Sequence, residues 1–169
     1  MTDGRPCDFD GIAPGTEDRT PCSPEVDEGF RGIKIHAPQE VLFGPDTRDS
    51  LFGGFARIVV SGACQLPYPA LGLRGRWNSA ILLIAIDTRD RQVYAGIQKP
   101  FGSPAPPLDP LDGTGLTPED FADTVACEWF DANLATVLHL PEREAEYDVH
   151  ATLGPYNSNV VHIKVRRKR

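Results

Sequence analysis

The stretch that decides the fold is Tyr147-Asp-Val-His-Ala-Thr-Leu153, followed by Gly154-Pro-Tyr-Asn-Ser158 and then Asn159-Val-Val-His-Ile-Lys-Val165. Apolar side chains recur at every second position in the first and last of these segments. That period of two is typical of β-strands, whose side chains alternate between two faces. The middle segment contains glycine, asparagine and serine, which favour turns. The sequence therefore predicts a β-hairpin at this end of the chain.

A pairing register for the hairpin follows from matching side chains across the two strands. Placing Leu153 opposite Asn159 aligns apolar residues on one face and charges of opposite sign on the other, an arrangement that stabilises cross-strand pairs. The predicted pairs are Ala151 with Val161, Val149 with Ile163, Tyr147 with Val165, Glu146 with Arg166, Asp148 with Lys164, His150 with His162, and Thr152 with Val160. A slip of one residue would move charges into the core, so we expect the register to be strongly specified.

Leu140 and Tyr147 flank a polar connection just before the first of these strands. Their spacing resembles the tyrosine corner of immunoglobulin-like and fibronectin type III domains, over roughly residues 138–166. This resemblance implies an antiparallel two-sheet β-sandwich. The strand that follows Tyr147 contains no cysteine, so a disulfide of the antibody type between the two sheets is not expected.

Further strand candidates precede the hairpin at the spacing of a sandwich. They cover residues 30–36, 55–64, 80–86, 92–97 and 125–130, whereas 132–140 fits either a strand or a short helical turn. We therefore expect an all-β immunoglobulin-like sandwich of about seven strands over residues 29–169.

Two segments differ in composition from the expected sandwich. Residues 1–28 are rich in acidic residues and proline and poor in apolar side chains, so we expect a flexible acidic arm, unless it docks on the domain. Residues 98–118 contain too many prolines for a central strand and predict a long loop. The simplest position for that loop is across an edge of the sandwich.

Composition narrows the possible partners and compartments. The net charge of −7 argues against nucleic acid as a partner. The first residues hold no apolar signal core and no apolar run reaches membrane-spanning length, so we expect a soluble, cytoplasmic protein that does not bind membranes. Of the four cysteines, Cys64 and Cys127 lie in strand candidates. They are either small buried apolar residues or a disulfide pair in an oxidising compartment.

The recognisable catalytic motifs, such as G-x-S-x-G, H-E-x-x-H and the Walker loop, do not occur in the sequence. One metal site is conceivable, because the predicted register brings His150 opposite His162 with Asp148 on the same face. The simpler interpretation is two ordinary surface histidines, with no cofactor.

The apolar run at 80–86 indicates an interaction surface, because a strand that is apolar on both faces must be covered on both. In an immunoglobulin-like order this strand lies beside the final hairpin. The candidate interface residues are Leu82, Leu83, His150, Val160 and His162. Which of the two leucines faces the core is left open by the sequence.

We therefore expect a non-catalytic module that binds a protein partner or a second copy of itself. One alternative is a small metal-dependent or otherwise atypical enzyme that uses the face of His150 and His162. Another is a carbohydrate-binding module with aromatic stacking platforms at Trp77, Phe101, Trp129 and Tyr156. Metal analysis would separate the first alternative from the main hypothesis, and a glycan screen would separate the second.

Overall fold

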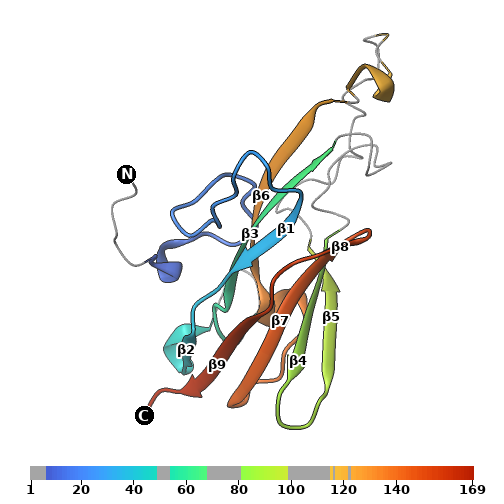
Figure 1. The fold of residues 1–169 in the computed structure, drawn as a ribbon. Coiled ribbons are helices and arrows are strands. Elements are labelled where there is room, and N and C mark those ends of the chain that lie inside the picture. Colours follow the sequence, from blue (N-terminus) through green and yellow to red (C-terminus); the bar gives the residue numbers. More distant parts are fainter. Residues whose placement is uncertain (1–6, 49–53, 68–80, 99–114, 116, 122) are drawn as a thin grey trace.

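The chain forms two β-sheets, as seen in a computed structural model that describes residues 7–48, 54–67, 81–98, 115, 117–121 and 123–169 (Figure 1). The strands are β1 (Gly32–His36), β2 (Glu40–Phe43), β3 (Val59–Pro67), β4 (Leu82–Asp87), β5 (Val93–Ile97), β6 (Val125–Asn133), β7 (Ala145–Leu153), β8 (Tyr156–Asn157) and β9 (Val161–Arg167). The helical elements are the 3-10 turns η1 (Phe9–Gly11), η2 (Pro45–Thr47) and η5 (Pro118–Phe121) and the short helix α1 (Leu134–Val137).

The smaller sheet has the strand order β1-β3-β6, and the larger has the order β2-β9-β7-β4-β5 with β8 paired to β7. All neighbouring strands are antiparallel except β2 and β9, which run parallel. The expectation of an all-β fold with two sheets is confirmed.

The core lies between the two sheets and is built from alternate residues of the strands, because successive side chains point to opposite faces. Its largest fully buried side chains include Phe43, Ile58, Leu66, Leu83, Phe130, Tyr147, Leu153 and Ile163. The β7 strand alternates strictly between buried and half-buried residues, as its sequence predicts.

The predicted hairpin forms, but its predicted register is wrong by two residues. Tyr147 lies opposite Ile163 and Val149 opposite Val161, so His162 faces Asp148 and not His150. A shift of two residues keeps every side chain on its predicted face, so alternation alone cannot detect it. The turn decides the register: Gly154 adopts a φ of 55°, a conformation that suits glycine, and Tyr156 pairs back onto Leu153.

Residues after this turn add an irregular step before β9 begins. The Ser158 hydroxyl accepts a hydrogen bond from the Ala151 N–H at 2.8 Å. The Asn159 side chain bonds both the N–H and the C=O of Ile35, at 2.9 and 3.0 Å, and so ties the start of β9 to the other sheet.

The remaining strand predictions agree with the structure apart from their ends. Two strands were not predicted: the two-residue β8, within the expected turn, and β2, which continues the chain from β1 into the other sheet. The ambiguous segment 132–140 contains both forms, since β6 ends at Asn133 and α1 follows at once. Most of the predicted loop 98–118 falls outside the described residues, although Gln98 is buried and donates its backbone N–H to Ile81 at 2.8 Å.

The N-terminal segment does not stand away from the sandwich. Residues 7–28 lie along β1, β3 and β6, which is the docked alternative to the expected flexible arm (Figure 1). We call residues 7–28 the N-terminal cover. Every residue of β3 from Val59 to Leu66 is buried, because the core encloses one face of the strand and the N-terminal cover encloses the other.

Candidate functional site

The outer face of the β4–β5 hairpin carries a continuous group of apolar side chains, which we call the β4–β5 patch. Its members are Leu82, Ile84 and Ile86 of β4 and Val93, Ala95 and Ile97 of β5. The register joins them as three cross-strand pairs: Leu82 with Ile97, Ile84 with Ala95, and Ile86 with Val93. No charged residue interrupts this group.

The patch is accessible at its β5 side. Val93 is 59% exposed and Ile97 is 51% exposed, whereas the three β4 side chains are half-buried. Exposed apolar groups that adjoin one another mark interaction surfaces more often than isolated ones do. Because β5 is the last strand of its sheet among the described residues, the patch also reaches a sheet edge.

The two leucines of the predicted interface lie on opposite faces of β4. Leu82 lies on the outer face, whereas Leu83 is completely buried in the core. Leu83 is therefore part of the core packing, and it is not available to a partner. The strand does lie beside β7 as expected, with Leu82 opposite Thr152 and Ile84 opposite His150.

A polar band on β7 and β9 borders the patch. The Nδ1 atom of His162 donates a hydrogen bond to Asp148 Oδ1 at 3.0 Å, and its Nε2 lies 3.5 Å from Glu146 Oε2. Arg166 also bonds Glu146. This band is charged, but its members pair among themselves. Val160, at 62% exposure, lies just before β9.

The metal hypothesis loses the geometry on which it was based, because His150 faces Ile84 across the strands and His162 faces Asp148. Within the part of the chain that the structure describes, no group of three or more His, Cys, Asp or Glu side chains is placed to hold a metal ion.

The turn of the β4–β5 hairpin is anchored by Arg143, which precedes β7. Its guanidinium bonds the buried Asp87 at 2.9 Å and Asp90 at 2.8 Å. Two hydrogen bonds hold the pKa of Asp90 below its usual range, the larger effect coming from the backbone N–H of Gln92 and the next from the Arg143 guanidinium. The same carboxylates, Asp90 first, raise the pKa of Arg143. This connection fixes the hairpin, and with it the patch, to the body of the sandwich.

The inner face of β5 is held just as closely. A Cβ atom at Gly96 would overlap the carbonyl oxygen of Val137 in α1, so this strand and helix approach each other closely only because residue 96 is glycine. Tyr94 packs edge-on against Tyr147, with ring centroids 6.0 Å apart. Burial raises the pKa of Tyr147 to about 12. Its hydroxyl has no hydrogen-bond partner among the described residues, so the tyrosine-corner bond is not made there.

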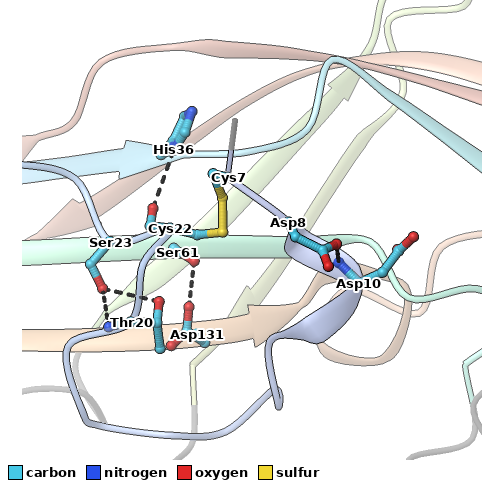
Figure 2. The surroundings of a disulfide bond; sticks show 9 residues. All are labelled: Cys7, Asp8, Asp10, Thr20, Cys22, Ser23, His36, Ser61 and Asp131. Carbon is cyan, nitrogen blue, oxygen red and sulfur yellow. Dashed lines mark hydrogen bonds between the residues drawn. A yellow bond between two sulfur atoms is a disulfide. The ribbon is translucent and has the colours of Figure 1, made fainter. Parts of the chain in front are cut away.

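The second distinctive region is the N-terminal cover, whose disulfide and surrounding side chains are shown in Figure 2. A disulfide joins Cys7 to Cys22, and Cys22 packs with Ile12 and Val59 in a small apolar cluster. The guanidinium of Arg57 donates hydrogen bonds to the backbone carbonyls of Asp10 and Ile12. The remaining cysteines are not bonded to each other: Cys64 is buried, and burial raises its pKa to about 12.

A carboxylate is buried beneath this cover. Asp131 of β6 accepts hydrogen bonds from the hydroxyls of Ser61 and Thr16, the latter at 2.9 Å, while its backbone bonds Gly15 and Thr16. Burial raises the pKa of Asp131, and the hydrogen bonds from the surrounding hydroxyls oppose that rise. The sequence did not identify Asp131 as a buried acid, because its burial depends on the folded N-terminal cover.

Ser61, Asp131 and His36 occupy neighbouring strands, yet they do not form a catalytic relay. A relay needs the imidazole between the hydroxyl and the carboxylate. Here Ser61 donates directly to Asp131, and the Nδ1 atom of His36 lies 3.1 Å from the carbonyl oxygen of Cys22 (Figure 2). The arrangement is that of a hydrogen-bonded structural group.

The aromatic residues proposed for carbohydrate stacking do not gather into a platform in the described chain. Trp129 of β6 and Tyr156 of β8 are half-buried and belong to different sheets. Trp77 and Phe101 lie outside the described residues.

Comparisons with known proteins give no identity. No protein-family model matches this sequence, and no curated protein matches it. Among the described residues, no helix has the length and apolar character needed to cross a bilayer. Function has to be inferred from the surfaces of the molecule.

Proposed function

We propose that this chain is a non-catalytic, immunoglobulin-like module that binds a protein through the β4–β5 patch. The observation that carries this proposal is the run of six adjoining apolar side chains on the outer face of β4 and β5, which ends in the exposed Val93 and Ile97. A solvated sheet face is normally polar, and the neighbouring face of β7 and β9 follows that rule.

The strand order supports the immunoglobulin-like part of the proposal. In such sandwiches the first, second, fourth and fifth strands form one sheet, and the third, sixth and seventh form the other. The order β1-β3-β6 against β9-β7-β4 fits that scheme for six strands, with β2 as a continuation of the first strand, whereas β5 lies beside β4 in the larger sheet and not in the smaller one. Tyr147 is buried near the start of β7, which also supports the proposal.

The disulfide bears on where this module works. Disulfides form and persist in oxidising compartments. We therefore favour an oxidising compartment for the chain over the cytoplasm, on the basis of the Cys7–Cys22 bond. Alkylation of thiols in intact producing cells, followed by mass spectrometry, would find Cys7 and Cys22 unmodified. Alkylated Cys7 and Cys22 would place the chain in a reducing compartment.

The binding proposal is tested with one variant and one matched control. Ile84→Lys puts a charge at the middle of the patch, whereas Leu42→Lys puts the same charge at an exposed apolar position on β2, at the opposite edge of the sheet. Proteins cross-linked to the full chain in extracts of the producing cells are identified, purified and titrated against each variant. Circular dichroism confirms that both variants fold.

We expect Ile84→Lys to weaken the affinity of the partner by at least about tenfold and Leu42→Lys to leave it unchanged, since burying an unpaired charge opposes binding. The proposal fails if no protein binds saturably, or if Ile84→Lys binds as tightly as the unaltered chain.

A further inference from the structure

We propose that two copies of this chain associate by antiparallel pairing of β5 with β5 across a two-fold axis at Ala95. This inference builds on the proposed function: the paired strands bring the β4–β5 patches of both copies onto one side of a joined sheet. The partner at the β5 edge is therefore a second copy of the chain, and the patch beside it remains the surface for another protein.

The open edge of β5 presents a definite set of backbone groups. The N–H of Asp87 donates to Gln92, and the N–H of Gln98 donates to Ile81, which are the two ends of the β4–β5 ladder. Hydrogen-bonded pairs alternate along an antiparallel ladder, so even-numbered residues of β5 bond to β4. The N–H and C=O groups of Val93, Ala95 and Ile97 therefore point away from β4.

Over the described residues of β5, this edge lacks the usual protection against pairing. Natural edge strands are blocked by charged side chains, proline or a bulge. The five residues of β5 are Val-Tyr-Ala-Gly-Ile, and they pair with β4 without interruption. The sheet order places β5 at its end, and no strand of the described chain lies on its other side.

The strand is complementary to itself in one register. With Ala95 opposite Ala95 of the second copy, Val93 lies opposite Ile97 of that copy, and all the edge groups of these residues meet in hydrogen-bonded pairs. Tyr94 then lies opposite Gly96 of the second copy, in a pair without hydrogen bonds, where side chains approach most closely.

Side-chain pairing on the outer face is the most specific part of this match. Val93 and Ile97 are exposed apolar side chains of β5, and the register places each of them opposite the other in the second copy. On the inner face the Val137 carbonyl fills the space beside Gly96 and Tyr94 packs against Tyr147, so the match depends on the outer face. Two-fold symmetry provides the pair of Val93 with Ile97 twice, so a second copy of the chain fits the edge better than an unrelated extended segment.

The association is measured by sedimentation velocity on the full chain over a series of concentrations. We expect the mass to rise with concentration toward that of a dimer. Ala95→Lys places two like charges opposite each other at the axis and should raise the dissociation constant at least about tenfold. Leu42→Lys, on the edge strand β2 at the other end of the sheet, should leave it unchanged.

The register is tested by cross-linking in a Cys127→Ser background, which removes the half-buried free thiol. Hydrogen-bonded partners in an antiparallel pair have Cα atoms about 5.5 Å apart, within the range that a disulfide spans. Ala95→Cys should therefore form a covalent dimer under mild oxidation. Val93→Cys should not form a covalent dimer. Residue 93 lies opposite Ile97 of the second copy, so residue 93 of that copy is four residues further along its strand.

A chain that stays monomeric at every concentration overturns this inference, and so does equal cross-linking by the two cysteine variants. The proposed function is tested separately. If the chain is monomeric and Ile84→Lys loses partner binding, the proposed function stands and the dimer does not. If the chain is dimeric and Ile84→Lys binds the partner as tightly as the unaltered chain, the dimer stands and the proposed function does not.

Discussion

The environment of Asp131 is determined by the N-terminal cover that lies over it. Its carboxylate has no exposed surface and is held by the hydroxyls of Ser61 and Thr16. Removal from water disfavours the charged form, and this cost exceeds the gain from the hydrogen bonds, so the pKa of Asp131 is raised. This direction is opposite to that of Asp46, Asp90 and Glu146, whose pKa values are lowered by hydrogen bonds.

The raised pKa predicts a pH dependence of known sign. A carboxyl whose folded pKa exceeds its unfolded value contributes stability that is present below the unfolded value, 3.8, and is lost as pH rises through the folded pKa. The free energy of unfolding of the unaltered chain, relative to Asp131→Asn, should therefore increase as pH falls from about 7 toward about 4. Chemical denaturation at a series of pH values measures it.

Asp90 provides the control of opposite sign. Its pKa is lowered by the Gln92 N–H and by Arg143, so its contribution is present above the unfolded value and is lost as pH falls. Relative to Asp90→Asn, the unaltered chain should lose stability on acidification. Parallel curves for the two variants would contradict the assignment of Asp131 as a buried acid.

Leu82 and Leu83 are adjacent and identical, yet they differ in what surrounds them. Leu83→Ala removes a completely buried side chain and should lower the free energy of unfolding by about 2–5 kcal/mol. Leu82→Ala trims a half-buried side chain on the outer face and should cost about 1 kcal/mol or less. Guanidinium denaturation measures both, and equal losses would mean that the faces are assigned wrongly.

At the scale of elements, β5 depends on a helix of one turn. Gly96 lies against the Val137 carbonyl, and Arg143 ties the hairpin turn to the loop before β7. The patch is therefore supported from behind at both ends of the strand, which keeps its outer face in a fixed position.

The approach of β5 to α1 can be tested directly. Gly96→Ala adds a methyl group where the Val137 carbonyl lies, so strand or helix must shift, at a cost of about 1–3 kcal/mol in the free energy of unfolding. The control is Ala95→Ser, at the adjacent outward position, where we expect a change of less than about 0.5 kcal/mol. Equal stability of the Gly96→Ala variant and the unaltered chain would show that the two elements are not in close contact.

The elements also show which features a sequence can predict. Alternation identified the faces of β7 and β9 because the period of a strand is two, and the assumed immunoglobulin-like order placed the strand at 80–86 beside the final hairpin. Alternation could not choose between registers that differ by two residues, since that choice is made by the turn at Gly154 and by the bonds of Ser158 and Asn159. The sequence also left open which face of the sheet Leu82 occupies, because a strand that is apolar on both sides carries no alternation.

At the scale of the whole molecule, the N-terminal cover buries β3, the central strand of the three-stranded sheet, on its outer face. Composition predicted a flexible arm because its own apolar content is low. Its attachment instead uses contacts with distant residues: the bonds from Arg57, the Asp131 group and the disulfide. None of these has a local signal in the sequence, and no spacing of the four cysteines indicates which of them pair.

The disulfide should determine how firmly the cover is attached. Reduction of the Cys7–Cys22 bond, whose cysteines are 15 residues apart, releases a constraint of about 3 kcal/mol on the unfolded segment. Arg19 is exposed within this loop, so trypsin should cleave after it faster when the bond is reduced. Mass spectrometry of the fragments measures the rate.

The control for this experiment is Cys127→Ser, which removes a thiol outside the cover and should leave the cleavage rate unchanged. Unchanged cleavage after reduction, together with an unchanged denaturation midpoint, would show that the cover is held by its other contacts alone.

The parallel pairing of β2 with β9 has a mechanical consequence. The chain enters β2 from the N-terminal side at one end of the pair, and it leaves β9 toward the C-terminus at the other end. A pulling force on these two strands therefore acts along them in opposite directions and loads their hydrogen bonds together in shear, where an antiparallel pair pulled the same way would open one bond at a time. The ion pair between Lys168 and Asp46, at 2.6 Å, adds a further contact just after β9, where the force on that strand would be applied.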